Sequence, residues 1–246
     1  MVFRTDLAVE ARELLEKDIG GTDYFTQRYG DVTLTRLKIK TPEAAGKMCK
    51  PEGTYLTFDV PPFSDDFRDP AARIELIGKE LASLLPQRGL ILVAGLGNTE
   101  ITPDNLGPKT AKGVLATRHI TGELARSTGL DDLRPVAVLA PGVLGQTGIE
   151  TGELLYSVTQ KLRPAALIVV DALASRRLDR LGCTVQVSDT GISPGSGVGN
   201  HRNGLTEENL NVKVIGIGVP TVVDAATIVH RSEERRVGKE CRSRWS

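Results

Sequence analysis

The chain has 246 residues, of which 40% are hydrophobic and 25% are charged, so it can bury the core of one compact α/β domain. Basic and acidic residues balance at 31 each, which gives no electrostatic reason to expect a nucleic acid or a membrane as partner. No apolar run reaches the ~18 residues of a transmembrane helix, no signal-peptide pattern opens the chain, and the three cysteines lack metal-ligand spacing. These features predict a reducing, cytoplasmic location.

The N-terminal residues predict one helix and two strands. A helical pattern begins near Leu7, and either Thr5 or Asp6 can serve as its N-cap. Apolar and polar residues alternate over 32–39, which predicts a half-exposed strand, and 54–60 predicts another.

The next stretch predicts a central strand followed by a carboxylate. An amphipathic helix over 71–85 leads into the apolar run 90–94, which is short and bounded by glycine. Such a run predicts a strand buried on both faces, as in a parallel sheet. The turn after it brings Asp104 to the carboxyl end of the strand, where open α/β sheets place their ligands. We expect the following helix near 112–128.

A second strand repeats this arrangement. The apolar run 166–170 predicts a buried strand that ends in Asp171. Packing explains this carboxylate poorly, because burying a charge costs free energy unless the charge is partnered. If the strand neighbours the one at 90–94, Asp104 and Asp171 face one crevice. The alternative is that Asp171 caps the next helix.

The rest of the pattern fixes the expected fold class. It predicts a strand over 135–139, a helix over 151–162, a short edge strand over 184–188, and a strand over 212–219 with a helix starting at Pro220. Because strands and helices alternate, we expect an α/β fold, a three-layer α/β/α sandwich with a mostly parallel central sheet.

Glycine loops and histidines give no cofactor motif. Gly95-Leu96-Gly97 lacks the third glycine of a dinucleotide fingerprint, and the loop at 195–199 lacks the Lys-Ser/Thr ending of a P-loop. His119, His201 and His230 are isolated. We therefore expect no cofactor, and the sequence leaves metal dependence open.

Several blocks together resemble the germination protease (spore protease) family of endospore-forming bacteria, which is similar in fold to the hydrogenase maturation proteases. The blocks are Thr5-Asp6-Leu7-Ala8-Val9-Glu10-Ala11, Thr102-Pro103-Asp104, Asp171-Ala172-Leu173-Ala174 and Gly218 to Ala225. The resemblance implies one protease domain over 1–230 with a hydrogenase-maturation-protease-like fold and with residues 1–6 as propeptide. It also implies Asp104 and Asp171 as the catalytic pair, and a C-terminal part of the family that is missing here. Residues 231–246 lose all apolar periodicity, so we interpret them as a non-native tail, with a genuine basic tail as the alternative.

The resemblance also implies a function. It implies an endopeptidase that begins the degradation of small acid-soluble spore proteins during spore germination, in the cytoplasm of the forespore or spore core. Its preferred bond follows Glu or Asp and precedes an apolar residue. It further implies a homotetramer, made as a zymogen that cleaves itself between Asp6 and Leu7.

Two mechanisms and one inactive alternative follow from the two carboxylates. In the favoured aspartic-type mechanism, one ionised and one protonated carboxyl activate a water and protonate the product, and the sequence does not assign the two roles. In the second, the carboxylates hold a divalent metal that activates the water, as in a metal-dependent maturation-type peptidase. The third reading is an inactive truncated binding module of the same fold.

Overall fold

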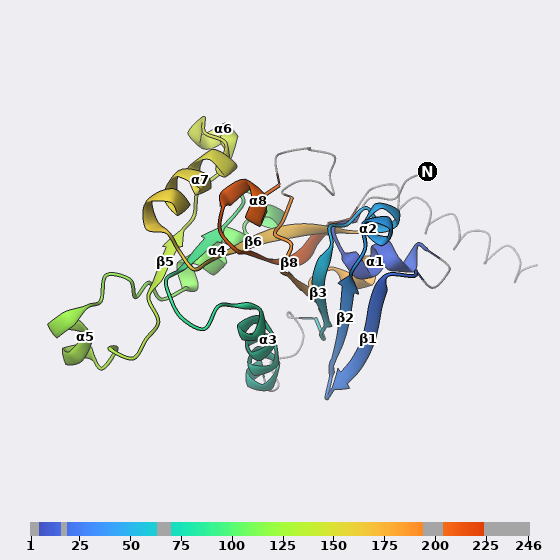
Figure 1. Cartoon of the computed structure of the whole chain (residues 1–246), viewed down its shortest axis with the longest axis horizontal. Helices are drawn as coiled ribbons and strands as arrows, with labels where there is room; N and C mark the ends of the chain where they lie inside the picture. The colour runs from blue at the N-terminus through green and yellow to red at the C-terminus, as the bar shows by residue number, and fades with distance from the viewer. Residues whose placement is uncertain (1–4, 16–18, 63–69, 194–203, 224–246) are drawn as a thin grey trace, which may run out of the picture.

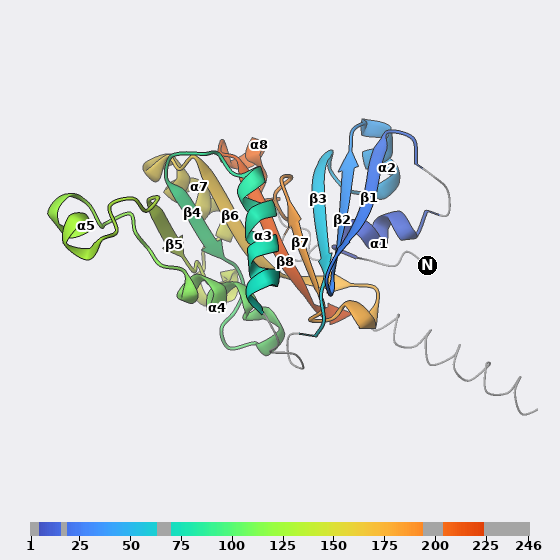
Figure 2. The ribbon, with the colours of Figure 1, turned by 90° about the horizontal axis from the view of Figure 1, so that it is seen from below.

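The computed structural model describes the chain except residues 1–4, 16–18, 63–69, 194–203 and 224–246. One sheet of eight strands, in the order β1-β2-β3-β7-β8-β6-β4-β5, forms the core (Figures 1 and 2). The strands are β1 (Thr22–Tyr29), β2 (Val32–Ile39), β3 (Gly53–Asp59), β4 (Ile91–Gly95), β5 (Val136–Leu139), β6 (Ala166–Ser175), β7 (Thr184–Ser188) and β8 (Val214–Val223). The expected domain boundary at 230 and the tail 231–246 lie outside the described residues.

The sheet is mixed, so the prediction of a mostly parallel sheet is wrong. Strands β8, β6, β4 and β5 pair in parallel, whereas β1, β2, β3, β7 and β8 pair antiparallel in succession. The antiparallel half begins with β1 and β2, which only two residues separate, and so short a connection can join only antiparallel neighbours. The α/β class itself is confirmed, and the parallel half carries the alternation of strands and helices that predicted it.

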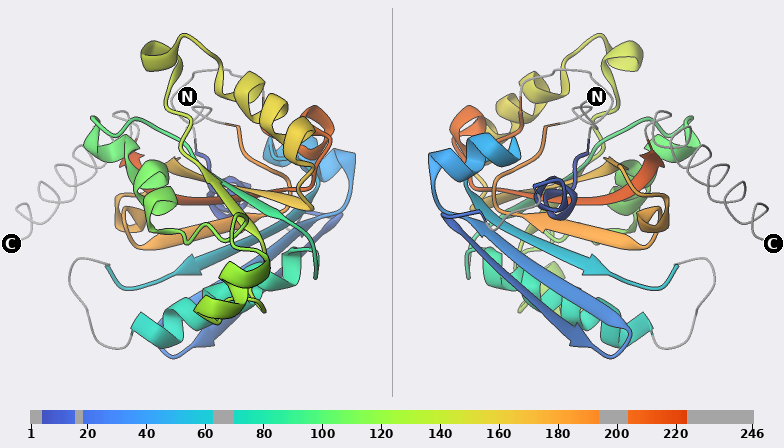
Figure 3. Two further views of the ribbon diagram at one scale, coloured as in Figure 1. Left: turned by 90° about the vertical axis from the view of Figure 1, so that its left-hand side faces the viewer. Right: turned by 90° about the vertical axis from the view of Figure 1, so that its right-hand side faces the viewer.

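Helices cover both faces of the parallel half, which gives the three expected layers (Figure 3). On one face, Ile168 and Val170 of β6 pack in a core with side chains of α3 (Pro70–Leu84) and α4 (Leu106–Gly113). On the other face, Leu167 and Val169 pack with α7 (Thr151–Leu162) and α8 (Glu207–Leu210). Successive residues of a strand point to opposite faces, so a continuous apolar run such as 166–170 serves both cores.

The antiparallel half carries the N-terminal elements. Helices α1 (Ala8–Glu13) and α2 (Pro42–Met48) contribute to a separate core with Leu37, Ile39 and Tyr55 of β2 and β3. The remaining short helices are α5 (Gly122–Thr128), α6 (Leu144–Thr147), η1 (Thr102–Asp104) and η2 (Leu178–Arg180). In the described part of the chain, no helix combines the length and the apolar character that crossing a membrane requires.

Three expected elements differ in the structure. The helix expected near 112–128 is not continuous: α4 ends at Gly113 and α5 begins only at Gly122. Between them the chain bonds to β5 through Thr117, whose Oγ1 accepts from the Val136 N–H at 2.9 Å. The strand at 184–188 is not an edge strand, since β7 lies between β3 and β8. No helix starts at Pro220, which continues β8 opposite Leu173.

Candidate active site

Asp104 lies in a tight turn that follows β4. The residue ends η1, is half-buried, and its Oδ2 accepts a hydrogen bond from the Asn98 N–H at 2.8 Å. Gly97 makes this turn possible, because its φ is +117° and a Cβ there would lie 1.9 Å from the Asp104 carbonyl oxygen. On the far side of η1, Thr221 Oγ1 of β8 donates to the Pro103 carbonyl at 2.7 Å. The turn that carries Asp104 is therefore held between the end of β4 and β8.

Asp171 lies within β6 and not at its end, which corrects the predicted strand boundary. Pairing with β4 stops at Val170, but pairing with β8 continues through Gly218, opposite Asp171, as far as Ser175. The Asp171 side chain is 6% exposed, and its Oδ1 accepts from the Ala172 N–H at 2.9 Å. Asp171 is thus the first residue of β6 beyond the reach of β4, and it does not cap a helix.

The structure brings the two predicted aspartates to one region of the sheet. Strands β4 and β6 are parallel neighbours, as expected, with Gly95 opposite Val170. The chain leaving β4 stays attached to β6, because the Leu96 N–H donates to the Val170 carbonyl at 2.8 Å. The η1 turn contacts both β6 and β8. Asp104 and Asp171 therefore belong to adjoining segments at the carboxyl edge of the parallel strands, which is where α/β sheets bind ligands.

The N-terminal segment attaches to the same strand. The Asp6 N–H donates to the Ala174 carbonyl at 2.9 Å, and the Ala174 N–H donates to Asp6 Oδ2 at 2.8 Å. Leu7 is fully buried and packs in a small cluster with Val9 and Leu173. Asp171 lies between the attachment of Leu96 and that of Asp6 along β6. The expected N-cap is wrong, because Leu7 occupies that position and α1 begins at Ala8.

Two residues that sequence reasoning missed bind the peptide unit between Asp6 and Leu7. Lys50 Nζ donates to the Asp6 carbonyl at 3.0 Å, and Gln186 Nε2 donates to it at 3.3 Å. Gln186 Oε1 also accepts from the Ala8 N–H at 2.7 Å. The only sequence signal was an amide inside the apolar strand 184–188, and nothing in the sequence linked Lys50 to this segment.

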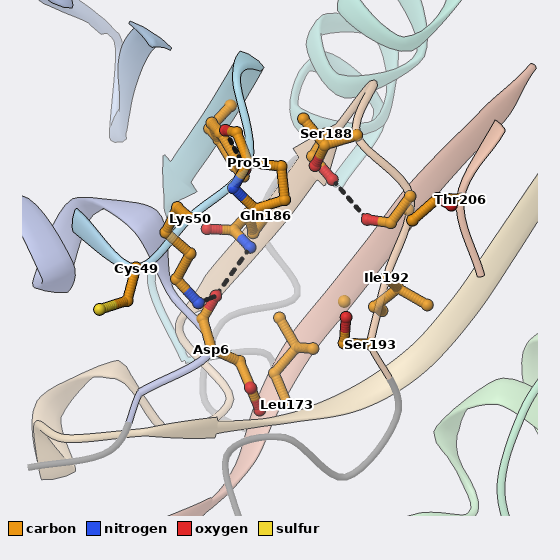
Figure 4. Close-up of a pocket in the computed structure, with 15 residues that line it drawn as sticks. Asp6, Cys49, Lys50, Pro51, Leu173, Gln186, Ser188, Ile192, Ser193 and Thr206 are labelled. Carbon is orange, nitrogen blue, oxygen red and sulfur yellow. Dashed lines mark hydrogen bonds between the residues drawn. The ribbon is translucent and has the colours of Figure 1, made fainter. Parts of the chain in front are cut away.

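A cavity of 170 Å³ adjoins this peptide (Figure 4). Its wall includes Leu173, two residues beyond Asp171 on β6, and Gly218, which pairs with Asp171. Because alternate residues of a strand share a face, Leu173 and Asp171 point to the same side of the sheet. The other lining residues used below are Asp6, Lys50, Tyr55 and Gln186.

Burial shifts two titratable groups of the cavity wall. It lowers the pKa of Lys50, and the nearby Asp6 carboxylate acts in the opposite direction. Burial also raises the pKa of Tyr55 to about 12, while its hydroxyl donates to the Pro51 carbonyl at 2.9 Å. In α1, Glu10 is fully buried, and its Oε2 accepts a hydrogen bond from the Arg176 N–H at 2.7 Å.

The described residues contain no group of three or more His, Cys, Asp or Glu side chains arranged to hold a metal ion. His119 lies in the described part of the chain. His201, His230 and the glycine loop at 195–199 lie outside it.

Comparison with known proteins gives a consistent family. The family model described as germination protease matches residues 3–241. A germination protease of Caldanaerobacter subterraneus subsp. tengcongensis is 46% identical over 236 residues, covering 94% of this chain and 72% of that protein. One from Clostridium perfringens is 43% identical and covers 92% and 72%. One from Bacillus cereus is 41% identical and covers 92% and 64%.

Among solved structures, the [NiFe] hydrogenase maturation protease HycI from Thermococcus kodakarensis KOD1 matches at 17% identity and a TM-score of 0.38. The match covers 60% of this chain and 88% of that one.

Proposed function

This chain belongs to the germination protease family, and we propose that it is an endopeptidase in which Asp104 and Asp171 are the catalytic pair. Membership of the family makes it a protease connected with spore germination. The assignment is supported by the contact of the η1 turn, which carries Asp104, with β6, which carries Asp171. It is also supported by the cavity that Leu173 of β6 and Gly218, the partner of Asp171 on β8, help to line.

The proposed reaction is attack of a water molecule on a peptide carbonyl carbon. One ionised carboxylate takes a proton from the water, and the other carboxyl, in its protonated form, donates a proton to the departing amine. Asp171 is buried beside Gly218 and Leu173, so water is limited and the charge that develops is weakly screened. Such a site favours proton transfer between fixed groups.

We further propose that the substrates are small acid-soluble spore proteins, cleaved after Glu or Asp and before an apolar residue. Thr5-Asp6-Leu7-Ala8 has this pattern in the chain itself. The protein is accordingly proposed to be a zymogen that cleaves its own Asp6–Leu7 bond on mild acidification, when a carboxyl gains the proton that it must donate. The support is that Asp6 is hydrogen-bonded to Ala174, three residues along β6 from Asp171. A homotetramer located in the spore core completes the proposal.

Neutralising each aspartate tests this function. In the full chain, Asp104→Asn and Asp171→Asn should each slow hydrolysis of a peptide containing a Glu-Leu-Ala sequence by about 10²–10⁴-fold, because the amide keeps the shape and loses the proton transfer. Asp132→Asn is the matched control, since Asp132 is exposed in a loop distant in sequence from both. Near-normal hydrolysis by either folded variant would remove that residue from the catalytic pair.

Removal of divalent metal separates the two mechanisms. If the two carboxyls act without an ion, dialysis against a chelator should leave the hydrolysis rate unchanged within about twofold, whereas loss of a required ion removes several kcal/mol of charge stabilisation. Activity that disappears and returns on addition of one metal would instead assign the carboxylates to a metal site. A chain that cleaves no peptide under either condition would match the inactive binding module.

A further inference from the structure

The carbonyl oxygen of Asp6 has two side-chain donors that come from different parts of the chain. Lys50 follows α2 and is 44 residues away, and Gln186 lies on β7, 180 residues away (Figure 4). Their donor nitrogens lie 3.0 and 3.3 Å from the oxygen. A backbone carbonyl oxygen has two lone pairs, and here an ammonium and an amide occupy both, so its environment is more electropositive than that made by neutral backbone N–H donors.

We propose that Lys50 and Gln186 stabilise the oxyanion that forms on the Asp6 carbonyl when the protein cleaves its own Asp6–Leu7 bond. This inference rests on the self-cleavage proposed above and adds two catalytic residues to it. In this arrangement the bond is cleaved where it lies, within its own chain.

The contacts around the bond hold every part of the reacting peptide. The Leu7 N–H, which becomes the leaving amine, donates to Thr5 Oγ1 at 3.1 Å. Gln186 spans the peptide, because its Oε1 accepts from the Ala8 N–H at 2.7 Å. Lys50 Nζ also donates to the Thr5 carbonyl at 3.0 Å. A reacting group fixed from both sides in this way needs little reorganisation to reach the transition state.

The chemical step balances with the groups present. Water adds to the Asp6 carbonyl carbon, its proton passes to the ionised carboxylate, and the carbonyl π pair moves to the oxygen held by Lys50 and Gln186. The oxyanion then collapses, the carbon–nitrogen bond breaks, and the protonated carboxyl supplies a proton to the Leu7 nitrogen. The products are a C-terminal carboxylic acid at Asp6, which then ionises to solvent, and an amine at Leu7, and the catalytic pair again holds one proton.

A cavity large enough for water adjoins Asp6, on the face of the sheet that carries Asp171. The cavity of 170 Å³ is lined by Asp6, Lys50 and Gln186, and it exceeds the roughly 10–15 Å³ that one water needs by the same measure. Leu7 packs against Leu173, whose Cα lies about 7 Å along the strand from that of Asp171. The bond therefore lies beside a water-sized space on the face of the sheet that carries Asp171.

Self-cleavage by the full chain tests the assignment. The appearance of a new N-terminus at Leu7 is followed by mass spectrometry after mild acidification, at two protein concentrations. Lys50→Met should slow this step by about 10²–10³-fold, the usual effect of removing one oxyanion donor, and Gln186→Leu should also slow it. Lys50→Arg keeps the charge and the donors and should stay within about tenfold of the unmodified chain. Lys47→Met is the control, since Lys47 is an exposed lysine of α2 that pairs with Glu43.

Each outcome has a defined meaning. Unchanged or faster processing by both Lys50→Met and Gln186→Leu overturns the inference, because these two residues would then only bind the N-terminal segment without stabilising the oxyanion. A rate that rises with protein concentration also overturns it, because cleavage would then occur between molecules. An equal loss in Lys50→Arg and Lys50→Met, together with a lower unfolding midpoint in both, indicates a structural role and overturns it as well. If the unmodified chain never yields Leu7 as its N-terminus, the proposed self-cleavage fails, and this inference fails with it.

Discussion

Tyr55 shows how burial changes the chemistry of a single side chain. Its pKa is raised from 10.0 to about 12, so the folded state favours the neutral phenol. Between these two values the folded chain binds more protons than the unfolded chain, and the free energy of unfolding falls as pH rises. The contribution is fully present below pH 10, is lost as pH approaches 12, and amounts to at most about 3 kcal/mol.

Urea unfolding between pH 9 and pH 11.5 measures this effect. Tyr55→Phe has no phenol to titrate, so its stability should fall less steeply with pH than that of the unmodified chain. Stability curves that fall in parallel for the two proteins would show that Tyr55 does not titrate as described.

At the scale of residues, the sequence drew attention to Asp104 and Asp171 but not to Lys50 and Gln186, which contact Asp6. Asp104 and Asp171 were recognisable because each follows an apolar run, and charge next to a buried strand needs an explanation. Lys50 and Gln186 were not, because their contacts to Asp6 cross 44 and 180 positions of sequence. Such contacts depend on the order of strands in the sheet, which local periodicity does not encode.

Helix α4 fixes the turn that carries Asp104 against β6, and Gly107 allows the close approach. A Cβ at Gly107 would lie 2.1 Å from the Leu96 carbonyl oxygen and 2.5 Å from that of Val170. Gly107→Ala should therefore push α4 away from the sheet, lower the free energy of unfolding by about 1–3 kcal/mol or more, and reduce hydrolysis by displacing Asp104.

Gly113→Ala in the same helix is the matched control. A Cβ at Gly113 would meet no atom within 4 Å, so alanine there should raise stability by up to about 1 kcal/mol through its better helix propensity. Urea denaturation of both variants makes the comparison. Equal effects of the two substitutions would mean that α4 does not pack against the strands as described.

At the scale of elements, the sequence predicted the strands buried on both faces and missed the exposed or interrupted elements. The continuous apolar runs in β4 and β6 predicted strands inside the sheet, because apolar residues that point to both faces must be covered on both faces. β1 was missed, because six of its eight residues are exposed and it shows no apolar face. We predicted that β8 ends before Pro220, but the strand continues through this residue. Pairing of β8 with β7 has already ended at Gly218, so on that side, within the described residues, Pro220 has no strand partner that needs its missing N–H.

At the scale of the whole molecule, the candidate site lies where the two halves of the sheet meet. Strand β8 pairs in parallel with β6 and antiparallel with β7, and the cavity is lined from all three strands by Leu173, Gln186 and Gly218. The parallel half supplies the aspartates, and Gln186 of β7 and Lys50 next to α2 supply the donors to Asp6. The sequence predicted the parallel half, in which the proposed pair lies, but it did not predict the junction, which depends on how β7 joins β8.

Asp104 and Asp171 are proposed to act as one catalytic unit. The most direct test is a double-mutant cycle on peptide hydrolysis with Asp104→Asn, Asp171→Asn and the double variant. Groups that act in one proton-transfer step are strongly non-additive, so each single variant should lose about 10²–10⁴-fold and the double variant no more than the worse single one. Losses that multiply in the double variant would contradict the claim, because each aspartate would then contribute independently of the other.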